Sequence, residues 1–143
     1  ARFMSHPYFT MPAPKSLARD AFKDLSTAVT MLTDADALAP LVQAVVESVS
    51  AACAACPTSP ERLLVTGGGR HNKTLMSGLA DSLSCDVAPV EAVGLDGDMV
   101  EAQAFAYLAV RVARGLPISS PQTTGVPRPM TGGKIAPAFK STD

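Results

Sequence analysis

Three consecutive glycines, Gly67, Gly68 and Gly69, form the stretch of this sequence best suited to hold a ligand. They follow the apolar run 63–65 and precede Asn72, which is placed to cap a helix. Glycine has no Cβ, so backbone amides in such a turn can approach a phosphate or a ribose closely. Taken alone, the glycine turn fits a nucleotide site and a ligand-free strand-to-helix turn equally well.

The glycine turn matches neither of the two commonest nucleotide-binding signatures. A dinucleotide fingerprint requires a third spaced glycine where Asn72 stands, and an acidic residue at a set distance beyond it. A Walker A loop requires Gly-Lys-Ser or Gly-Lys-Thr, which does not follow Gly69. A Rossmann-like cofactor site is therefore disfavoured, and any nucleotide bound here belongs to a different fold.

Three carboxylates, Asp96, Asp98 and Glu101, crowd the expected start of a helix. Carboxylates stabilise the positive end of the helix dipole, which accounts for Asp96 and for Asp98 as the expected N-cap. Glu101 fits two interpretations equally well. It either closes a capping box with Asp98 or directs a carboxylate toward the hydroxyl groups of a sugar.

Other kinds of site find little support in the sequence. His6 and His71 are not spaced as metal ligands, so no metal site is predicted. Cys53 and Cys56 have no second pair to complete a zinc site, and we expect them to be small core residues in a reducing compartment. No Gly-x-Ser-x-Gly elbow is present, which disfavours the commonest hydrolases.

Apolar periodicity predicts helices and strands in alternation around these residues. The most secure helix runs from a cap at Asp34 or Asp36 to Cys56. A strand at 63–65, a helix after Asn72 and a second strand through 87–93 follow. This alternation predicts an α/β fold.

The last predicted helix and the two ends of the chain complete this organisation. A helix over 98–114 is rich in alanine, so we expect it to be buried on more than one side. Prolines make residues 1–15 an extended leading segment and residues 116–143 a loop-like tail with a short terminal strand at 134–136. We expect a single domain over residues 1–143.

Composition narrows the range of partners. The 143 residues are 47% apolar with a formal net charge of −1, so nucleic acid binding lacks a basic footprint. Apolar runs such as 41–55 are interrupted by polar residues and fall short of the roughly 20 that a membrane span needs. We therefore expect a soluble, cytoplasmic protein that binds neither nucleic acid nor membrane.

Segments 12–19, 63–72, 94–106 and 132–138, taken in this order, resemble the anhydro-N-acetylmuramic acid kinase family. The resemblance covers nearly the whole chain. It implies the carboxy-terminal part of such a kinase, an α/β ribonuclease H-like second lobe of the actin/Hsp70/sugar-kinase fold. Leu17 and Ala18 stand where we expect threonine and glycine in the family, which weakens the transfer of any ligand role to Lys15 or Arg19.

The resemblance also assigns roles to individual residues. It implies that Gly67, Gly68, Gly69 and Asn72 bind ATP and that Glu101 binds the sugar. The implied reaction opens the 1,6-anhydro ring of the sugar with water and transfers the γ-phosphoryl group of ATP, with Mg²⁺, to the freed 6-oxygen. The family's phosphate loop and catalytic aspartate lie upstream of the matched region, so no catalytic residue is expected here.

Two functions from different classes therefore remain open. The leading hypothesis is the nucleotide-binding lobe of a peptidoglycan-recycling kinase that needs a missing amino-terminal lobe, with a homodimer among its expected assemblies. The alternative is a non-catalytic nucleotide-binding or protein-interaction module. Its support is the proline-rich leading segment and the apolar helix faces, which suit docking onto another chain.

Overall fold

The structure is a computed structural model of the chain, and it describes residues 3–30 and 32–136. The chain divides into two compact units, each considered separately below. Unit 1 comprises Ala1–Met11 and Leu17–Glu101, and unit 2 comprises Pro12–Ser16 and Ala102–Asp143. A single domain over residues 1–143 stays a prediction.

Unit 1 begins with short 3₁₀ turns at Phe3–Ser5 and Pro7–Thr10, in the segment that was expected to be extended up to residue 15. A third 3₁₀ turn follows at Arg19–Phe22. His6 caps the second of these turns, because its Nδ1 accepts a hydrogen bond from the Tyr8 amide at 3.1 Å. The rings of Phe3 and Phe9 lie 5.1 Å apart between centroids in an edge-to-face arrangement. Ring packing thus compensates for the lack of regular structure in this segment.

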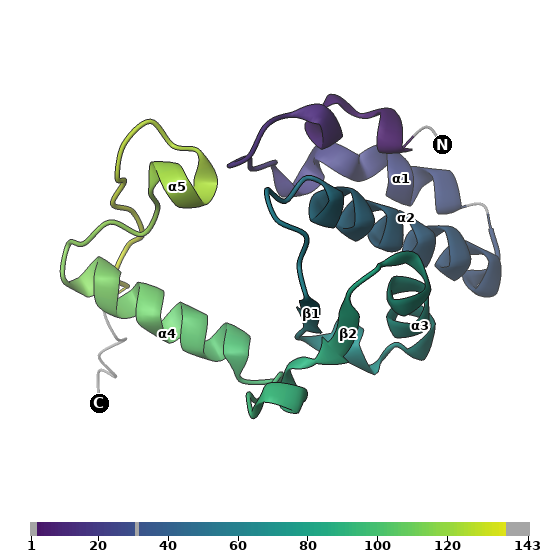
Figure 1. Ribbon diagram of the computed structural model, residues 1–143. Helices are drawn as coiled ribbons and strands as arrows, with labels where there is room; N and C mark the ends of the chain where they lie inside the picture. The colour runs from purple at the N-terminus through teal and green to yellow at the C-terminus, as the bar shows by residue number, and fades with distance from the viewer. Residues whose placement is uncertain (1–2, 31, 137–143) are drawn as a thin grey trace, which may run out of the picture. The chain divides into compact units, whose positions relative to one another are not determined.

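Two α-helices follow, α1 over Lys23–Val29 and α2 over Asp34–Ala54 (Figure 1). The predicted long helix is confirmed, but its N-cap is Thr33, whereas Asp34 or Asp36 was expected. Thr33 Oγ1 accepts from the Asp36 amide at 3.3 Å and donates to Asp36 Oδ2 at 2.7 Å. A threonine hydroxyl here satisfies one of the amides that a helix start leaves without a partner.

The predicted strand–glycine turn–helix unit is confirmed. Strand β1 (Arg62–Val65) pairs in parallel with β2 (Asp86–Pro89), and α3 (Lys73–Ser82) lies between them in the chain (Figure 1). The second strand is shorter than predicted, because Val90–Val93 forms a 3₁₀ turn. The small parallel sheet beside helices makes the chain mixed α/β.

The core of unit 1 lies where α3 packs against α2. Gly78 of α3 permits this close approach, because a Cβ built there would lie 3.1 Å from Val46 Cγ2 of α2. Val46 and Leu79 are each 3% exposed, and the buried apolar set among the described residues is Ala44, Val46, Leu79 and Val90. This packing holds the strand–turn–helix unit against the longest helix.

Helix α2 is also long and apolar enough over Asp36–Ala54 to cross a membrane, judged by length and composition alone, with a mean hydropathy of 1.5. The sequence was expected to contain no such stretch. Core helices of soluble proteins pass the same test but are mostly buried, whereas only 11% of this stretch is buried among the described residues. One helix of this kind is weak evidence for a membrane protein.

Unit 2 is built around α4, which spans Val100–Ala113 and has its first two residues in unit 1. A short helix, α5 (Pro121–Thr124), and an antiparallel bridge between Ser119 and Met130 follow. At Gly125, which has φ +73°, a Cβ would lie 2.7 Å from the carbonyl oxygen of Pro14. The leading segment around Pro14 therefore packs closely on the turn after α5. The terminal strand predicted at 134–136 does not form.

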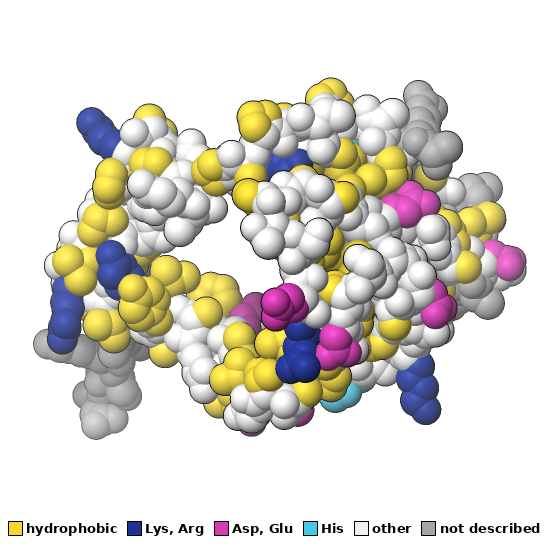
Figure 2. Space-filling model, viewed as in Figure 1, with side chains coloured by type: hydrophobic (Ala, Val, Ile, Leu, Met, Phe, Trp, Pro, Cys, Tyr) yellow, Lys and Arg dark blue, Asp and Glu magenta, His cyan; other side chains and the backbone are white. Residues whose placement is uncertain are grey.

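The expected burial of α4 is wrong for this chain. None of its residues is buried, and Phe105 and Tyr107 are 64% and 61% exposed. Figure 2 shows apolar side chains at the surface over this helix. Its alanines permit a close approach, but the described residues supply no element that covers it on several sides.

Candidate functional site

The glycine turn leaves open space beside its backbone. Gly67 has φ +68° and ψ −170°, a conformation that residues with a Cβ rarely adopt. A Cβ built at Gly67 or Gly68 would meet no heavy atom within 4 Å, while at Gly69 it would meet Leu75 Cδ2 at 3.3 Å. The structure thus brings the three glycines together at the end of β1 with room for a ligand against the first two.

Asn72 caps α3, as the sequence predicts. Its Oδ1 accepts a hydrogen bond from the Leu75 amide at 3.1 Å. The side chain is exposed, and the cap occupies its oxygen rather than its NH₂ group. Asn72 can therefore cap the helix and still present donors beside the glycine turn.

Arg70 is the residue of this site that sequence reasoning missed. Its side chain is only 4% exposed, although arginine is almost never buried unless it is paired. Nη1 donates to the Gly67 carbonyl at 2.8 Å, Nε to Glu91 Oε1 at 2.8 Å, and Nη2 lies 2.8 Å from Asp98 Oδ1. One guanidinium thus joins its own glycine turn to Glu91 and Asp98, which lie more than twenty residues further along the chain.

Gly97 completes this cluster through its backbone. Its amide donates to Glu91 Oε1 at 3.2 Å, and its carbonyl accepts from the Gly67 amide at 3.2 Å and from Thr66 Oγ1 at 3.1 Å. A Cβ at Gly97 would collide with the Arg70 side chain at Nε. Any side chain at this position would therefore displace the guanidinium from its partners.

The charges of the cluster reinforce one another. The hydrogen bond to Asp98 raises the pKa of Arg70, with a further contribution from Glu91, while burial acts in the opposite direction. The pKa of Glu91 is lowered, first by its own backbone amide, then by Arg70 and the Gly97 amide. Both groups are therefore held in their charged forms.

The acidic residues before α4 play different roles from those predicted. Asp98 was the expected N-cap, but its carboxylate pairs with Arg70. Asp96 shapes the turn instead: its Oδ1 accepts from the Asp98 amide at 3.0 Å, and its carbonyl accepts from the Val100 amide at 3.0 Å. The difference arises because the Arg70 guanidinium offers Asp98 a charged donor, whereas the start of the helix offers only neutral amides.

Glu101 lies on the first turn of α4 and is exposed. No hydrogen bond or ion pair to its carboxylate is found within the described ranges. The capping box with Asp98 does not form, since Asp98 is bound to Arg70. The carboxylate of Glu101 is thus open to a ligand, and its role in sugar binding stays a prediction.

Metal ligands and cysteine thiols are the other groups in the described part of the chain that could carry chemistry. No group of three or more His, Cys, Asp or Glu side chains in residues 3–30 and 32–136 is arranged to hold a metal ion. Cys53 is half-buried in α2, and burial raises the pKa of its thiol. Cys56 is exposed, so the prediction of a core position is wrong for this cysteine.

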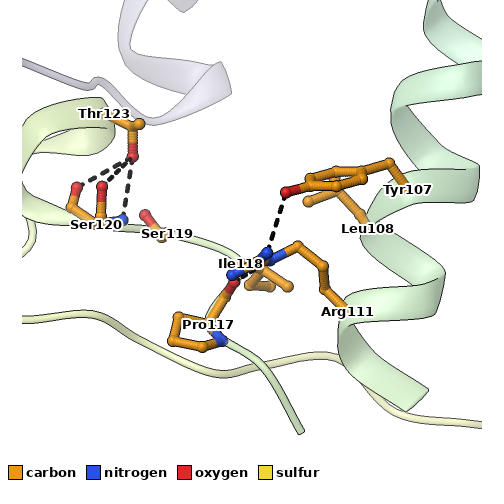
Figure 3. A pocket seen from close by; sticks show the side chains of 8 residues that line it. All are labelled: Tyr107, Leu108, Arg111, Pro117, Ile118, Ser119, Ser120 and Thr123. Atoms are coloured by element: carbon orange, nitrogen blue, oxygen red, sulfur yellow. Dashed lines mark hydrogen bonds between the residues drawn. The ribbon is translucent and has the colours of Figure 1, made fainter. Parts of the chain in front are cut away.

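Unit 2 has a separate cavity of about 270 Å³, lined by α4, α5 and the segment between them (Figure 3). Arg111 crosses it and donates to the Pro117 carbonyl and, from Nη1, to the Tyr107 hydroxyl at 3.0 Å. Ser120 and Thr123 bond to each other at the start of α5. The polar groups that line this cavity are mainly hydrogen-bonded to one another.

Comparison with known proteins identifies the family. The family model described as anhydro-N-acetylmuramic acid kinase matches residues 1–138. Among relatives with that name, those from Ruegeria sp., Cereibacter sphaeroides and Rhodospirillum rubrum are 56%, 57% and 54% identical over 93%, 95% and 94% of this chain. The chain spans little more than a third of their length, 36%, 37% and 36% respectively. On the strength of the match over residues 1–138, the chain belongs to the anhydro-N-acetylmuramic acid kinase family.

Proposed function

We propose that this chain is the carboxy-terminal, nucleotide-binding part of a kinase that opens 1,6-anhydro-N-acetylmuramic acid and phosphorylates it to N-acetylmuramic acid 6-phosphate. The observation that carries the proposal is the glycine turn with open space at Gly67 and Gly68, within a chain that matches this family almost end to end. ATP is the phosphoryl donor, and the product enters peptidoglycan recycling in the cytoplasm.

Each candidate residue has a role in this proposal. The backbone of Gly67–Gly69 approaches the nucleotide, and Asn72 donates to it from its NH₂ group. Glu101 accepts hydrogen bonds from sugar hydroxyls, since its carboxylate has no other partner within the described ranges. Mg²⁺ would neutralise charge on the phosphates when bound, and the described residues offer no cluster of three or more side chains that could hold it.

Catalysis requires more protein than this chain. A kinase of this type needs a base for the attacking water, and no residue here is assigned that role. In the proposal, the chain forms the ribonuclease H-like second lobe of an actin/Hsp70/sugar-kinase fold, and an amino-terminal lobe supplies the phosphate loop and the catalytic aspartate. A homodimer of the complete kinase is part of the same expectation.

The test is a chimera in which this chain replaces the matching region of the Cereibacter sphaeroides relative. Gly68→Ala adds one methyl group to the open side of the turn, so the KM for ATP should rise about tenfold while the protein stays folded. Ala80→Gly, an equally small change at an exposed site of α3, is the control. An unchanged KM for ATP in Gly68→Ala would contradict the proposal that the nucleotide binds at this turn.

One observation favours the alternative, a non-catalytic interaction module. Phe105, Tyr107 and Val110 of α4 are exposed apolar side chains, which would suit contact with another chain. Under this alternative the chain binds nucleotide weakly and the chimera turns over no sugar. If the chimera forms the phosphorylated sugar only in the presence of ATP, the kinase function is supported and the interaction module is rejected.

A further inference from the structure

We propose that Arg70 is a positioning residue that fixes the glycine turn relative to the loop before α4, so that the ATP site and the sugar site form together. The inference rests on the proposed function for the identity of the two ligands. The geometry that carries it is independent of any ligand, because it consists of contacts within unit 1.

The first step is that Arg70 and its partners come from three separate segments. Arg70 lies in the 3₁₀ turn Gly68–His71 that contains two of the three glycines. Glu91 lies in the 3₁₀ turn after β2, and Asp98 lies just before α4. The guanidinium therefore links the proposed ATP-binding turn to the loop that leads into Glu101.

The second step is that the link is rigid. A planar guanidinium donates in fixed directions, and here all three of its nitrogen atoms have an oxygen at 2.8 Å. Gly97 packs directly against it, and the Gly97 carbonyl ties back to the Gly67 amide. A change in the position of one loop would break several of these contacts at once.

The third step is that the pairing fits positioning better than stability alone. Burying the Arg70 guanidinium costs desolvation that offsets its attraction to the carboxylates of Glu91 and Asp98, which are themselves 46% and 73% exposed, so the pairs add little net stability. Its value lies in specifying one arrangement of the groups it contacts. Arg62 and Asp86 make a comparable 2.7 Å pair on β1 and β2, but their side chains are 51% and 57% exposed.

The experiment compares Arg70→Gln with the matched control Arg62→Gln in the Cereibacter sphaeroides chimera. Arg70→Gln should raise the KM for ATP and the KM for the anhydro-sugar, each by about tenfold, because both sites lose their common support. Arg62→Gln should leave both within about twofold, as an exposed ion pair contributes little. A merely structural Arg70 would instead lower the active fraction and kcat, with both KM values unchanged, and that result overturns the proposal.

A second measurement on the 143-residue chain tests the link without any substrate. Amide hydrogen exchange at Gly67 and Gly97 should be at least about tenfold faster in Arg70→Gln than in Arg62→Gln, because both amides bond within the cluster. Unchanged exchange at both glycines overturns the proposal, whatever the chimera does. A third outcome separates the two proposals. If exchange is faster in Arg70→Gln but the chimera without substitutions phosphorylates no sugar, the kinase function is rejected, while Arg70 is still shown to link the two loops.

Discussion

Residues only a few positions apart have very different surroundings in this chain, as Cys53 and Cys56 show. Cys53 is half-buried with a raised pKa, whereas Cys56 is exposed. Only thiolates react with iodoacetamide, so at pH 8 Cys56 should be alkylated several-fold faster than Cys53. Peptide mass spectrometry of a time course measures both rates. Equal rates would contradict the structural difference between the two sites.

Glu91 is expected to make the stability of the chain depend on pH. Its pKa in the folded chain lies below the ordinary value of 4.5, so its contribution is fully present above about 4.5 and is lost as the pH falls through the lowered pKa. Glu91→Gln should unfold at lower urea concentrations than wild type at pH 7, and the gap should close toward pH 3. A gap that stays constant over this range would show that the negative charge of Glu91 does not stabilise the folded chain.

At the scale of single elements, helix caps are the clearest test of local structure. Thr33 caps α2 and Asn72 caps α3, each with one side-chain oxygen. Replacing either by alanine should lower the free energy of unfolding by about 1 kcal/mol, while Asn72→Ser should restore most of the loss. Urea titrations monitored by circular dichroism provide the measurement. If Asn72→Ser regains stability in the chain but the same change raises the KM for ATP in the chimera, the cap and the nucleotide contact are separate roles of one residue.

The elements with strong local signals are those that the sequence predicted correctly. Apolar periodicity located α2 and α3, and the glycines between an apolar run and Asn72 located the turn. Arg70 was missed because its partners Glu91 and Asp98 lie more than twenty residues away, and no local pattern links them. Asp98 was assigned as a cap for the same reason. No local pattern shows that its carboxylate pairs with Arg70 instead of the helix amides.

At the scale of the whole molecule, the exposed apolar side chains of α4 and the greater length of the relatives both indicate that further protein covers this helix. Phe105 and Tyr107 are more than half exposed, and the chain spans little more than a third of the kinases that it matches. Burial of α4 was predicted from its composition, and burial on several sides requires elements beyond those described here. We expect the remainder of the kinase to supply them.

The most direct test of the account measures ATP-dependent phosphorylation of 1,6-anhydro-N-acetylmuramic acid by the 143-residue chain and by the Cereibacter sphaeroides chimera that contains it. The account predicts turnover by the chimera and none by the chain alone, because the chain supplies the glycine turn and Glu101 but no catalytic base. Turnover by the chain alone would contradict the claim that catalysis needs more protein than this chain. A folded chimera that binds ATP but shows no turnover would contradict the proposed kinase function.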